Sequence, residues 1–215
     1  MSTQWTGAPN SSVGGSSPWA GAGAALPSDR PDPFASVGEV RFLFSFDLAL
    51  PGQFKLWDDQ GRSLGQVRRD GSGWRAFLMS FALEDAEGRP LLLIRHQTPT
   101  HLVGYGTPFA LLNPAGVKIG ELTWSARQSA TLALAQGPRY QAAVSGWAWK
   151  GFDVLSGPLK VAVASRPNAL LPTPGRPGGL RLEFVPGMSR PPDHVFLVAL
   201  AAFICVFRPP TGFPT

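Results

Sequence analysis

The chain has one cysteine, Cys205, and little charge. Charged residues make up 15% of its 215 residues, and histidine occurs three times. A single cysteine excludes an internal disulfide framework and a cysteine-based zinc site. Because Cys205 stands in an apolar run, we interpret it as a small buried side chain in a reduced, cytoplasmic setting. The N-terminus also lacks the basic and apolar regions of a secretory signal.

Motifs of the common enzyme classes are absent as well. The sequence has no G-x-S-x-G elbow, no P-loop and no G-x-G-x-x-G after an expected strand. Its carboxylate pairs, Asp58–Asp59 and Glu84–Asp85, fall in expected turns, where turn chemistry explains them. We therefore expect no catalytic residues, no metal and no cofactor.

The positive charge is unevenly placed. From Lys118 onward there are ten Lys or Arg against four Asp or Glu, a balance of +6, while the first 117 residues sum to −1. A basic half could favour anionic surfaces such as phospholipid or nucleic acid. The simpler interpretation, solvated surface arginines, is favoured by the composition over a dedicated basic patch.

Residues 1–36 are interpreted as a flexible tail. They contain 23 Gly, Ser, Pro or Ala and show neither helical nor strand periodicity. Trp5, Trp19 and Phe34 are isolated aromatic residues that could serve as docking motifs for a protein partner. A plain solvated tail is the simpler alternative.

The chain from Glu39 to Val185 shows strand periodicity. In VRFLFSF, Val40, Phe42, Phe44 and Phe46 alternate with residues of the other face. Similar alternation is expected at Leu180, Leu182 and Phe184, at Leu132 and Leu134, and at Val161 and Val163. Counting this way predicts about twelve short strands, which is typical of an all-β barrel or sandwich.

An internal repeat explains many of these strands. FKLWDDQGRSLGQV begins at Phe54, FALEDAEGRPLLLI at Phe81 and FALLNPAGVKIGEL at Phe109. Each copy places Asp or Asn first and Gly last in a four-residue turn, where these residues favour a type I turn. We interpret each copy as a β-hairpin with its turn at Asp58–Gly61, Asp85–Gly88 or Asn113–Gly116.

The run from Val195 to Phe207 is the longest apolar stretch. Ser189 is a plausible cap, and Pro191 and Pro192 suit the first turn of a helix over about 191–207. Thirteen residues of helix span about 20 Å, whereas a bilayer core needs about 30 Å. A helix that is apolar on every side must be surrounded, and a closed barrel would surround it.

Together, about twelve strands, F-x-L-x-D-x-x-G hairpins and an apolar C-terminal helix resemble the tubby-like fold. Within it, the phospholipid scramblase and LURP-one-related group is the most similar, over Glu39 to about Arg208. The resemblance implies an all-β, closed barrel of about twelve strands around a central helix, with domain bounds 37–208 and a short tail at 209–215. The acidic calcium-binding segment of scramblases is not matched here, which makes calcium doubtful.

The core of the predicted helix comprises Val195, Phe196, Leu200, Phe203 and Phe207. The resemblance implies a non-catalytic module that binds phospholipid at the cytoplasmic membrane face, with genuine lipid scrambling or a soluble interaction scaffold as alternatives. The expected contacts with anionic headgroups are Lys150, Lys160, Arg166, Arg176 and Arg181. Nucleic acid is not an expected partner, and localisation is expected to be cytoplasmic and peripheral at the inner membrane face.

Overall fold

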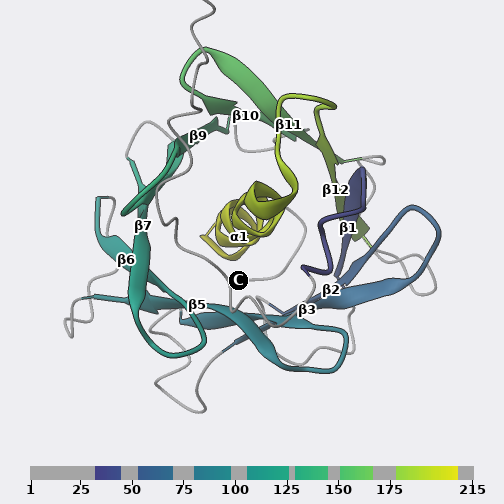
Figure 1. Ribbon diagram of the computed structural model, residues 1–215, viewed down its shortest axis with the longest axis horizontal. Helices are drawn as coiled ribbons and strands as arrows, with labels where there is room; N and C mark the ends of the chain where they lie inside the picture. The colour runs from purple at the N-terminus through teal and green to yellow at the C-terminus, as the bar shows by residue number, and fades with distance from the viewer. Residues whose placement is uncertain are drawn as a thin grey trace, which may run out of the picture.

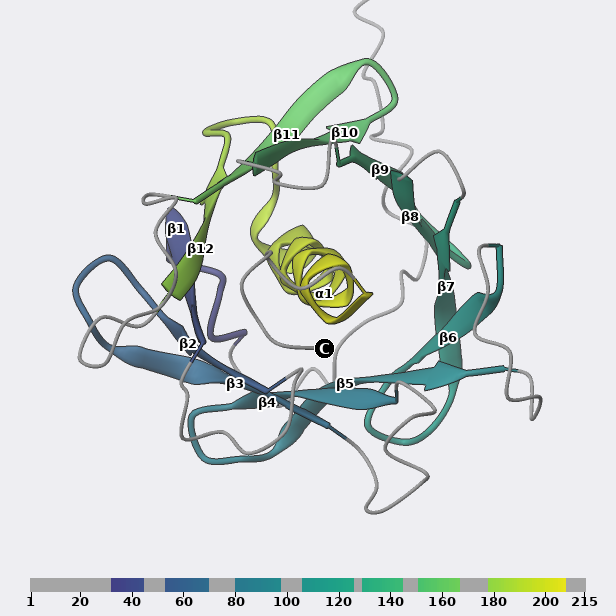
Figure 2. The ribbon, with the colours of Figure 1, turned by 180° about the vertical axis from the view of Figure 1, so that it is seen from behind.

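The structure is a closed antiparallel β-barrel with one helix inside it (Figures 1 and 2). The computed structural model describes residues 32–44, 53–69, 80–97, 106–125, 129–144, 151–166 and 178–207. The strands are β1 (Glu39–Phe44), β2 (Phe54–Trp57), β3 (Ser63–Arg69), β4 (Phe81–Asp85), β5 (Pro90–His96), β6 (Pro108–Leu112), β7 (Lys118–Trp124), β8 (Ser129–Leu134), β9 (Arg139–Ala143), β10 (Gly151–Ser156), β11 (Leu159–Ser165) and β12 (Gly178–Phe184). The helix, α1, runs from Pro191 to Phe207.

Each strand pairs with its neighbour in sequence, and the ring closes where β1 pairs with β12. Because the strands alternate in direction, the turns after β2, β4, β6, β8 and β10 lie at one end of the barrel, which we call the turn end. The connection from β12 to α1 lies at this end too. The helix therefore enters the barrel from the turn end. The predicted fold class is confirmed.

The three repeated hairpins have the predicted turns. The amides of Gly61, Gly88 and Gly116 donate to the carbonyls of Asp58, Asp85 and Asn113 at 2.9–3.3 Å. All three glycines have positive φ, 77–80°, and the amide of the first turn residue donates to the carbonyl of the residue after glycine at 2.9–3.0 Å. This combination is a type I turn closed by a glycine bulge, a detail that the turn residues alone did not predict.

The barrel interior is apolar. Val40, Phe42, Leu180 and Leu182 are buried on the inner face as predicted, each at most 1% exposed. The prediction that Val161 and Val163 share one face of their strand is wrong. On β11, Val163 stands opposite Asp153 on the outer face, whereas Ala162 and Ala164 oppose Val154 and Phe152 on the inner face. A bulge between Val154 and Leu155 shifts the register, and the small alanines leave room inside for the larger side chains of β10.

Helix α1 fills this interior. Every residue from Val195 to Cys205 is at most 5% exposed, which includes Val195, Phe196, Leu200 and Phe203 of the predicted helix core. The side chain of Phe207 lies outside the described residues. The ring of Phe203 meets the Phe109 ring of β6 edge-on, with centroids 5.2 Å apart. No helix in the described part of the chain is both long and apolar enough to cross a bilayer.

A short segment, Asp32–Val37, packs at the turn end before β1. Phe34 is fully buried, and its carbonyl oxygen lies 2.9 Å from Nδ1 of His194. From its sequence, Phe34 was expected to lie in a flexible tail that ends at residue 36. That placement is wrong for Phe34, because its ring completes the core at the mouth of the barrel, whereas residues 1–31 lie outside the described residues.

Candidate functional site: a basic rim at one end of the barrel

Four neighbouring connections at the turn end share one composition. Each contains glycine and ends in a cation: GVK at Gly116–Lys118, GPR at Gly137–Arg139, GPLK at Gly157–Lys160 and GMSR at Gly187–Arg190. None of these segments contains a carboxylate. Because the strands they join follow one another from β6 to β12, the four connections lie side by side along half of the turn end.

We call this half the basic rim, defined by Val117, Lys118, Arg139, Leu159, Lys160, Met188 and Arg190. All seven side chains are exposed. Lys118 Nζ lies 3.0 Å from Glu121 on the barrel wall, and Lys160 Nζ lies 2.6 Å from Asp153. In the described ranges, no carboxylate lies within ion-pair distance of Arg139 or Arg190. These two arginines therefore form no ion pair in the described structure, although Arg190 interacts electrostatically with Asp193 in the first turn of α1.

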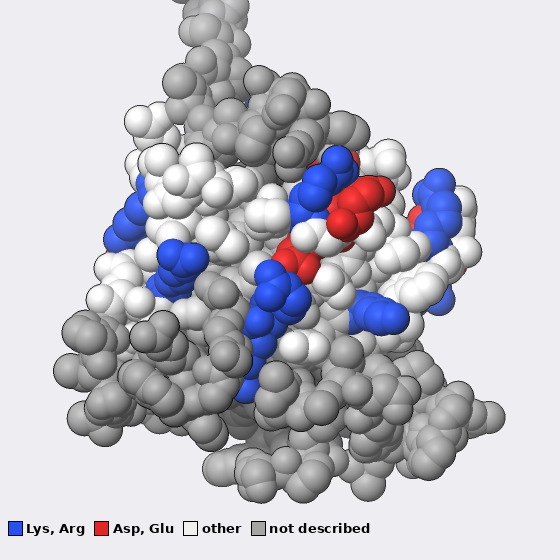
Figure 3. All heavy atoms as spheres, turned by 90° about the horizontal axis from the view of Figure 1, so that it is seen from below, with Lys and Arg blue, Asp and Glu red and all other residues white. Residues whose placement is uncertain are grey.

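The other half of the turn end is acidic. It consists of the β2–β3 turn, DDQGR, and the β4–β5 turn, DAEGR. Arg62 pairs with Asp58 at 2.6 Å, and Arg89 pairs with Asp85 at 2.7 Å and with Glu87 at 2.8 Å. We call these two turns the acidic rim. Figure 3 views the face of β2 to β5, where acidic side chains lie beside Lys and Arg side chains.

The Met188–Arg190 connection is held by the first turn of α1. The amides of Met188 and Ser189 donate to the carbonyl of Val185 at 3.1 and 3.3 Å. The Ser189 hydroxyl lies 3.1 Å from Nε2 of His194, whose ring stacks on Phe184 with centroids 3.9 Å apart. Ser189 was expected to cap the helix, but its hydroxyl contacts the imidazole because α1 begins two residues later, at Pro191.

His194 ties three elements together beneath the basic rim. Since the carbonyl of Phe34 can only accept, Nδ1 of His194 carries the donated hydrogen, and Nε2 is left to face Ser189. Burial raises the pKa of the neighbouring Asp193 carboxyl, and the influence of Tyr140 and Arg190 acts in the opposite direction. Burial also raises the pKa of Asp32, which accepts the Phe34 amide at 2.8 Å. This cluster fixes the rim connection to the helix and to the segment before β1.

The residues predicted to bind headgroups do not converge on one site. Lys160 belongs to the basic rim. Arg181 lies on the outer wall of β12, where Glu39 and Glu183 neutralise it at 2.5 and 3.1 Å. Arg166 follows β11 at the opposite end of the barrel, and burial lowers the pKa of its guanidinium. Lys150 and Arg176 lie outside the described residues.

Lys118, Arg139 and Arg190 were not among the cations predicted from the sequence to contact headgroups. A local signal for them was present, because these connections carry a cation and no carboxylate, whereas the turns DDQGR and DAEGR carry both. Recognising it required the strand order, since only the closed ring shows that these connections are neighbours at one end.

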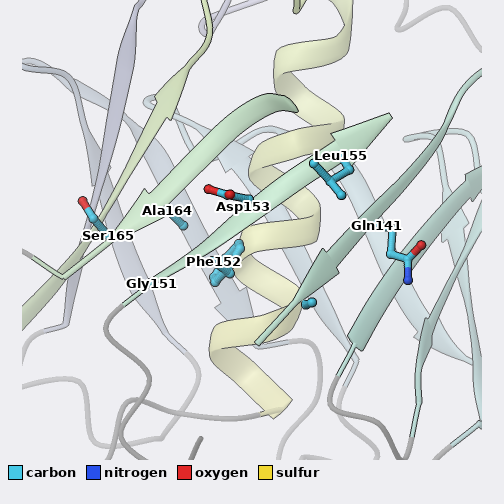
Figure 4. Close-up of a pocket in the computed structure, with 8 residues that line it drawn as sticks. Gln141, Gly151, Phe152, Asp153, Leu155, Ala164 and Ser165 are labelled. Atoms are coloured by element: carbon cyan, nitrogen blue, oxygen red, sulfur yellow. The ribbon is translucent and has the colours of Figure 1, made fainter. Parts of the chain in front are cut away.

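A shallow hollow of about 670 Å³ lies on the outside of β9, β10 and β11 (Figure 4). Its lining includes Gln141, Asp153, Leu155 and Ser165. Asp153 is the only ionisable residue among the described lining residues, and it is paired with Lys160. The hollow therefore offers no acid–base pair and no activated nucleophile. The described residues also contain no group of three His, Cys, Asp or Glu side chains placed to hold a metal.

Comparison with known proteins gives one structural likeness. A crystal structure of a protein from Arabidopsis thaliana matches with a TM-score of 0.53 and 14% sequence identity, over 80% of this chain and 94% of that one. At this identity the match shows a shared fold only. No protein-family model matches the chain, and neither does any curated protein sequence.

Proposed function

We propose that this chain is a non-catalytic module, similar to the scramblase and LURP-one-related proteins, that binds phospholipid at the cytoplasmic face of a membrane. One observation carries the proposal. Four consecutive connections at the turn end each present an exposed cation and no carboxylate, so that half of one end of the barrel is basic.

The basic rim suits a flat anionic surface better than a small anionic ligand. Its cations come from four separate connections spread along half the ring, and they do not surround a cavity. Anionic headgroups form an extended surface that several separated cations can meet together, and each Lys or Arg near such a surface contributes about 1 kcal/mol. Lys118 and Lys160 already form ion pairs with Glu121 and Asp153, which reduces their contribution to membrane binding. Arg139 and Arg190 are therefore the main expected contacts with headgroups.

The family resemblance adds support of a different kind. The F-x-L-x-D-x-x-G hairpins and the apolar terminal helix are the residues on which it rests, and a barrel with an internal helix agrees with them. A shared fold does not by itself specify a function. The proposal therefore depends on the basic rim, and the resemblance only selects phospholipid among anionic surfaces.

Sedimentation of the full chain with vesicles tests the proposal. We expect binding to vesicles that contain phosphatidylserine, little binding to pure phosphatidylcholine, and loss of binding as salt is raised, because screening shortens the electrostatic range to about 8 Å at 0.15 M. Absence of binding to anionic vesicles at low salt would refute it and favour a soluble interaction scaffold. A translocation assay in the same vesicles, with and without calcium, separates surface binding from lipid scrambling.

A further inference from the structure

We infer that the basic rim inserts Val117, Leu159 and Met188 into the hydrocarbon boundary of a phospholipid bilayer. The barrel then stands on the membrane with the N-terminal end of α1 toward it. This inference rests on the proposed function and adds a depth and an orientation to it.

The exposed apolar side chains carry this inference. Among the described residues, four large hydrophobic side chains are more than a third exposed: Val117 at 58%, Leu155 at 38%, Leu159 at 52% and Met188 at 51%. Three of them are in the basic rim. Single exposed apolar residues need no explanation, but three of the four connections of the basic rim carry one, a recurrence that the packing of the barrel does not require.

Each of these side chains comes just before a cation in sequence. Val117 precedes Lys118, Leu159 precedes Lys160, and Met188 stands two residues before Arg190. Apolar side chains flanked by Lys or Arg are typical of segments that lie in the membrane interface, where the apolar group enters the acyl boundary and the cation stays with the headgroups. This pairing of apolar and basic groups points to a lipid surface and not to an apolar protein partner.

The acidic rim predicts how the barrel is oriented on the membrane. The β2–β3 and β4–β5 turns lie at the same end, and they expose Asp59, Gln60 and Glu87 together with Arg62 and Arg89. Each turn holds two carboxylates and one arginine that is paired within the turn, so each keeps a net negative charge. Anionic headgroups repel these carboxylates. The barrel is therefore expected to tilt, with the basic rim in the interface and the acidic rim raised from it. Insertion is shallow, on the order of 5–10 Å, as for other interfacial elements.

Site-specific fluorescence tests the depth of each rim position in the full chain. The variants are Val117→Cys, Leu159→Cys and Met188→Cys, with Gln60→Cys as the control on the acidic rim. The native Cys205 is fully buried, and burial raises the pKa of its thiol, so a thiol-reactive label is directed to the introduced cysteine. The probe is an environment-sensitive fluorophore, and the vesicles contain phosphatidylserine and phosphatidylcholine, with brominated acyl chains as quenchers.

Labels at positions 117, 159 and 188 should shift to the blue and be quenched by brominated chains, whereas the label at position 60 should do neither. If the protein sediments with vesicles but the three labels remain in water, the insertion is refuted and the proposed function stands. Equal quenching at position 60 would refute the orientation. If the protein does not sediment at all, both proposals fail.

A second variant separates apolar insertion from electrostatic attraction. Leu159→Ser should weaken vesicle partitioning on the order of fivefold to tenfold, because a half-exposed leucine contributes its remaining transfer free energy when it enters hydrocarbon. It should leave the dependence of binding on salt unchanged, because no charge is removed. Unchanged partitioning for this variant would contradict insertion at position 159.

Discussion

Asp58 and Asp85 each organise one tight turn with a single carboxylate. Oδ1 of Asp85 accepts the amides of Glu87 and Arg89 at 3.1 and 2.8 Å, and Oδ2 accepts Nε of Arg89 at 2.7 Å. Asp58 makes the same set of contacts with the corresponding residues of its turn. Burial alone would raise the pKa of both carboxyls, but the backbone and side-chain hydrogen bonds from Arg62 and Arg89 outweigh it and lower the pKa.

These contacts predict a specific loss of stability in acid. A carboxyl whose pKa is lower in the folded than in the unfolded state stabilises the fold above its unfolded pKa, near 3.9, and this contribution is lost as the pH falls through the folded pKa. Urea unfolding between pH 6 and pH 3 should show this loss, and the variant Asp58→Asn with Asp85→Asn should show a smaller one. Asparagine keeps the turn acceptor, as Asn113 does with the amide of Val117 at 3.0 Å. An identical acid dependence in both proteins would contradict this assignment.

Phe34 shows how one residue can extend the folded unit. It stands among proline, serine and alanine, and no periodic pattern marks it. Its ring is buried at the mouth of the barrel, and its carbonyl oxygen is hydrogen-bonded to His194, which is 160 residues away in sequence. Local sequence patterns cannot reveal such a contact.

Replacing Phe34 by alanine should therefore lower the free energy of unfolding by about 3–5 kcal/mol, as expected for a buried phenylalanine. Chemical denaturation measures the change. The matched control is Val117→Ala, which removes a side chain that is 58% exposed and should change stability by less than about 0.5 kcal/mol. Equal effects of the two substitutions would show that Phe34 is not part of the core.

At the scale of elements, the hairpins and the helix depend on each other. The closed ring has an apolar inner face, and α1 has no polar face. Each element therefore covers surface that the other would leave in water. This mutual dependence explains why a run too short to span a bilayer is nevertheless apolar on all sides.

The substitution Leu200→Asp tests this dependence. Leu200 is fully buried in the middle of α1, so an aspartate there would place an unpaired charge inside the barrel. We expect the variant to lose its cooperative thermal transition and to accumulate in the insoluble fraction. Leu159→Asp, which changes the same residue type at a site that is 52% exposed, should remain folded. A soluble, cooperatively folded Leu200→Asp protein would contradict the central position of the helix.

At the scale of the whole molecule, sequence patterns predicted the architecture better than the site. Strand periodicity, the three hairpin repeats and the length of the apolar run predicted a closed barrel around a helix. The register shift on β11 was missed, because a bulge reverses which of Val163 and Ala164 faces inward. The cations predicted to contact headgroups do not form one site in the structure. The sequence does not show which cations are neutralised by carboxylates, and Arg181, for example, is neutralised by Glu39 and Glu183.

The closed ring divides the turn end into a basic half and an acidic half. This division is a property of the assembled barrel, since it depends on which connections are neighbours. It predicts that membrane affinity depends on where a positive charge lies and not only on the net charge of +5. A dependence on net charge alone would give the same loss for any exposed cation.

The most direct test compares vesicle affinity after removing one positive charge at different places. Arg139→Gln and Arg190→Gln remove a charge from the basic rim, whereas Lys55→Gln removes one from an exposed position on β2, on the outer wall of the barrel. Each rim substitution should weaken binding to phosphatidylserine vesicles roughly fivefold, as about 1 kcal/mol per cation predicts, and the control should change it little. Equal losses for all three variants, or no loss from the rim variants, would contradict the basic rim as the membrane-binding surface.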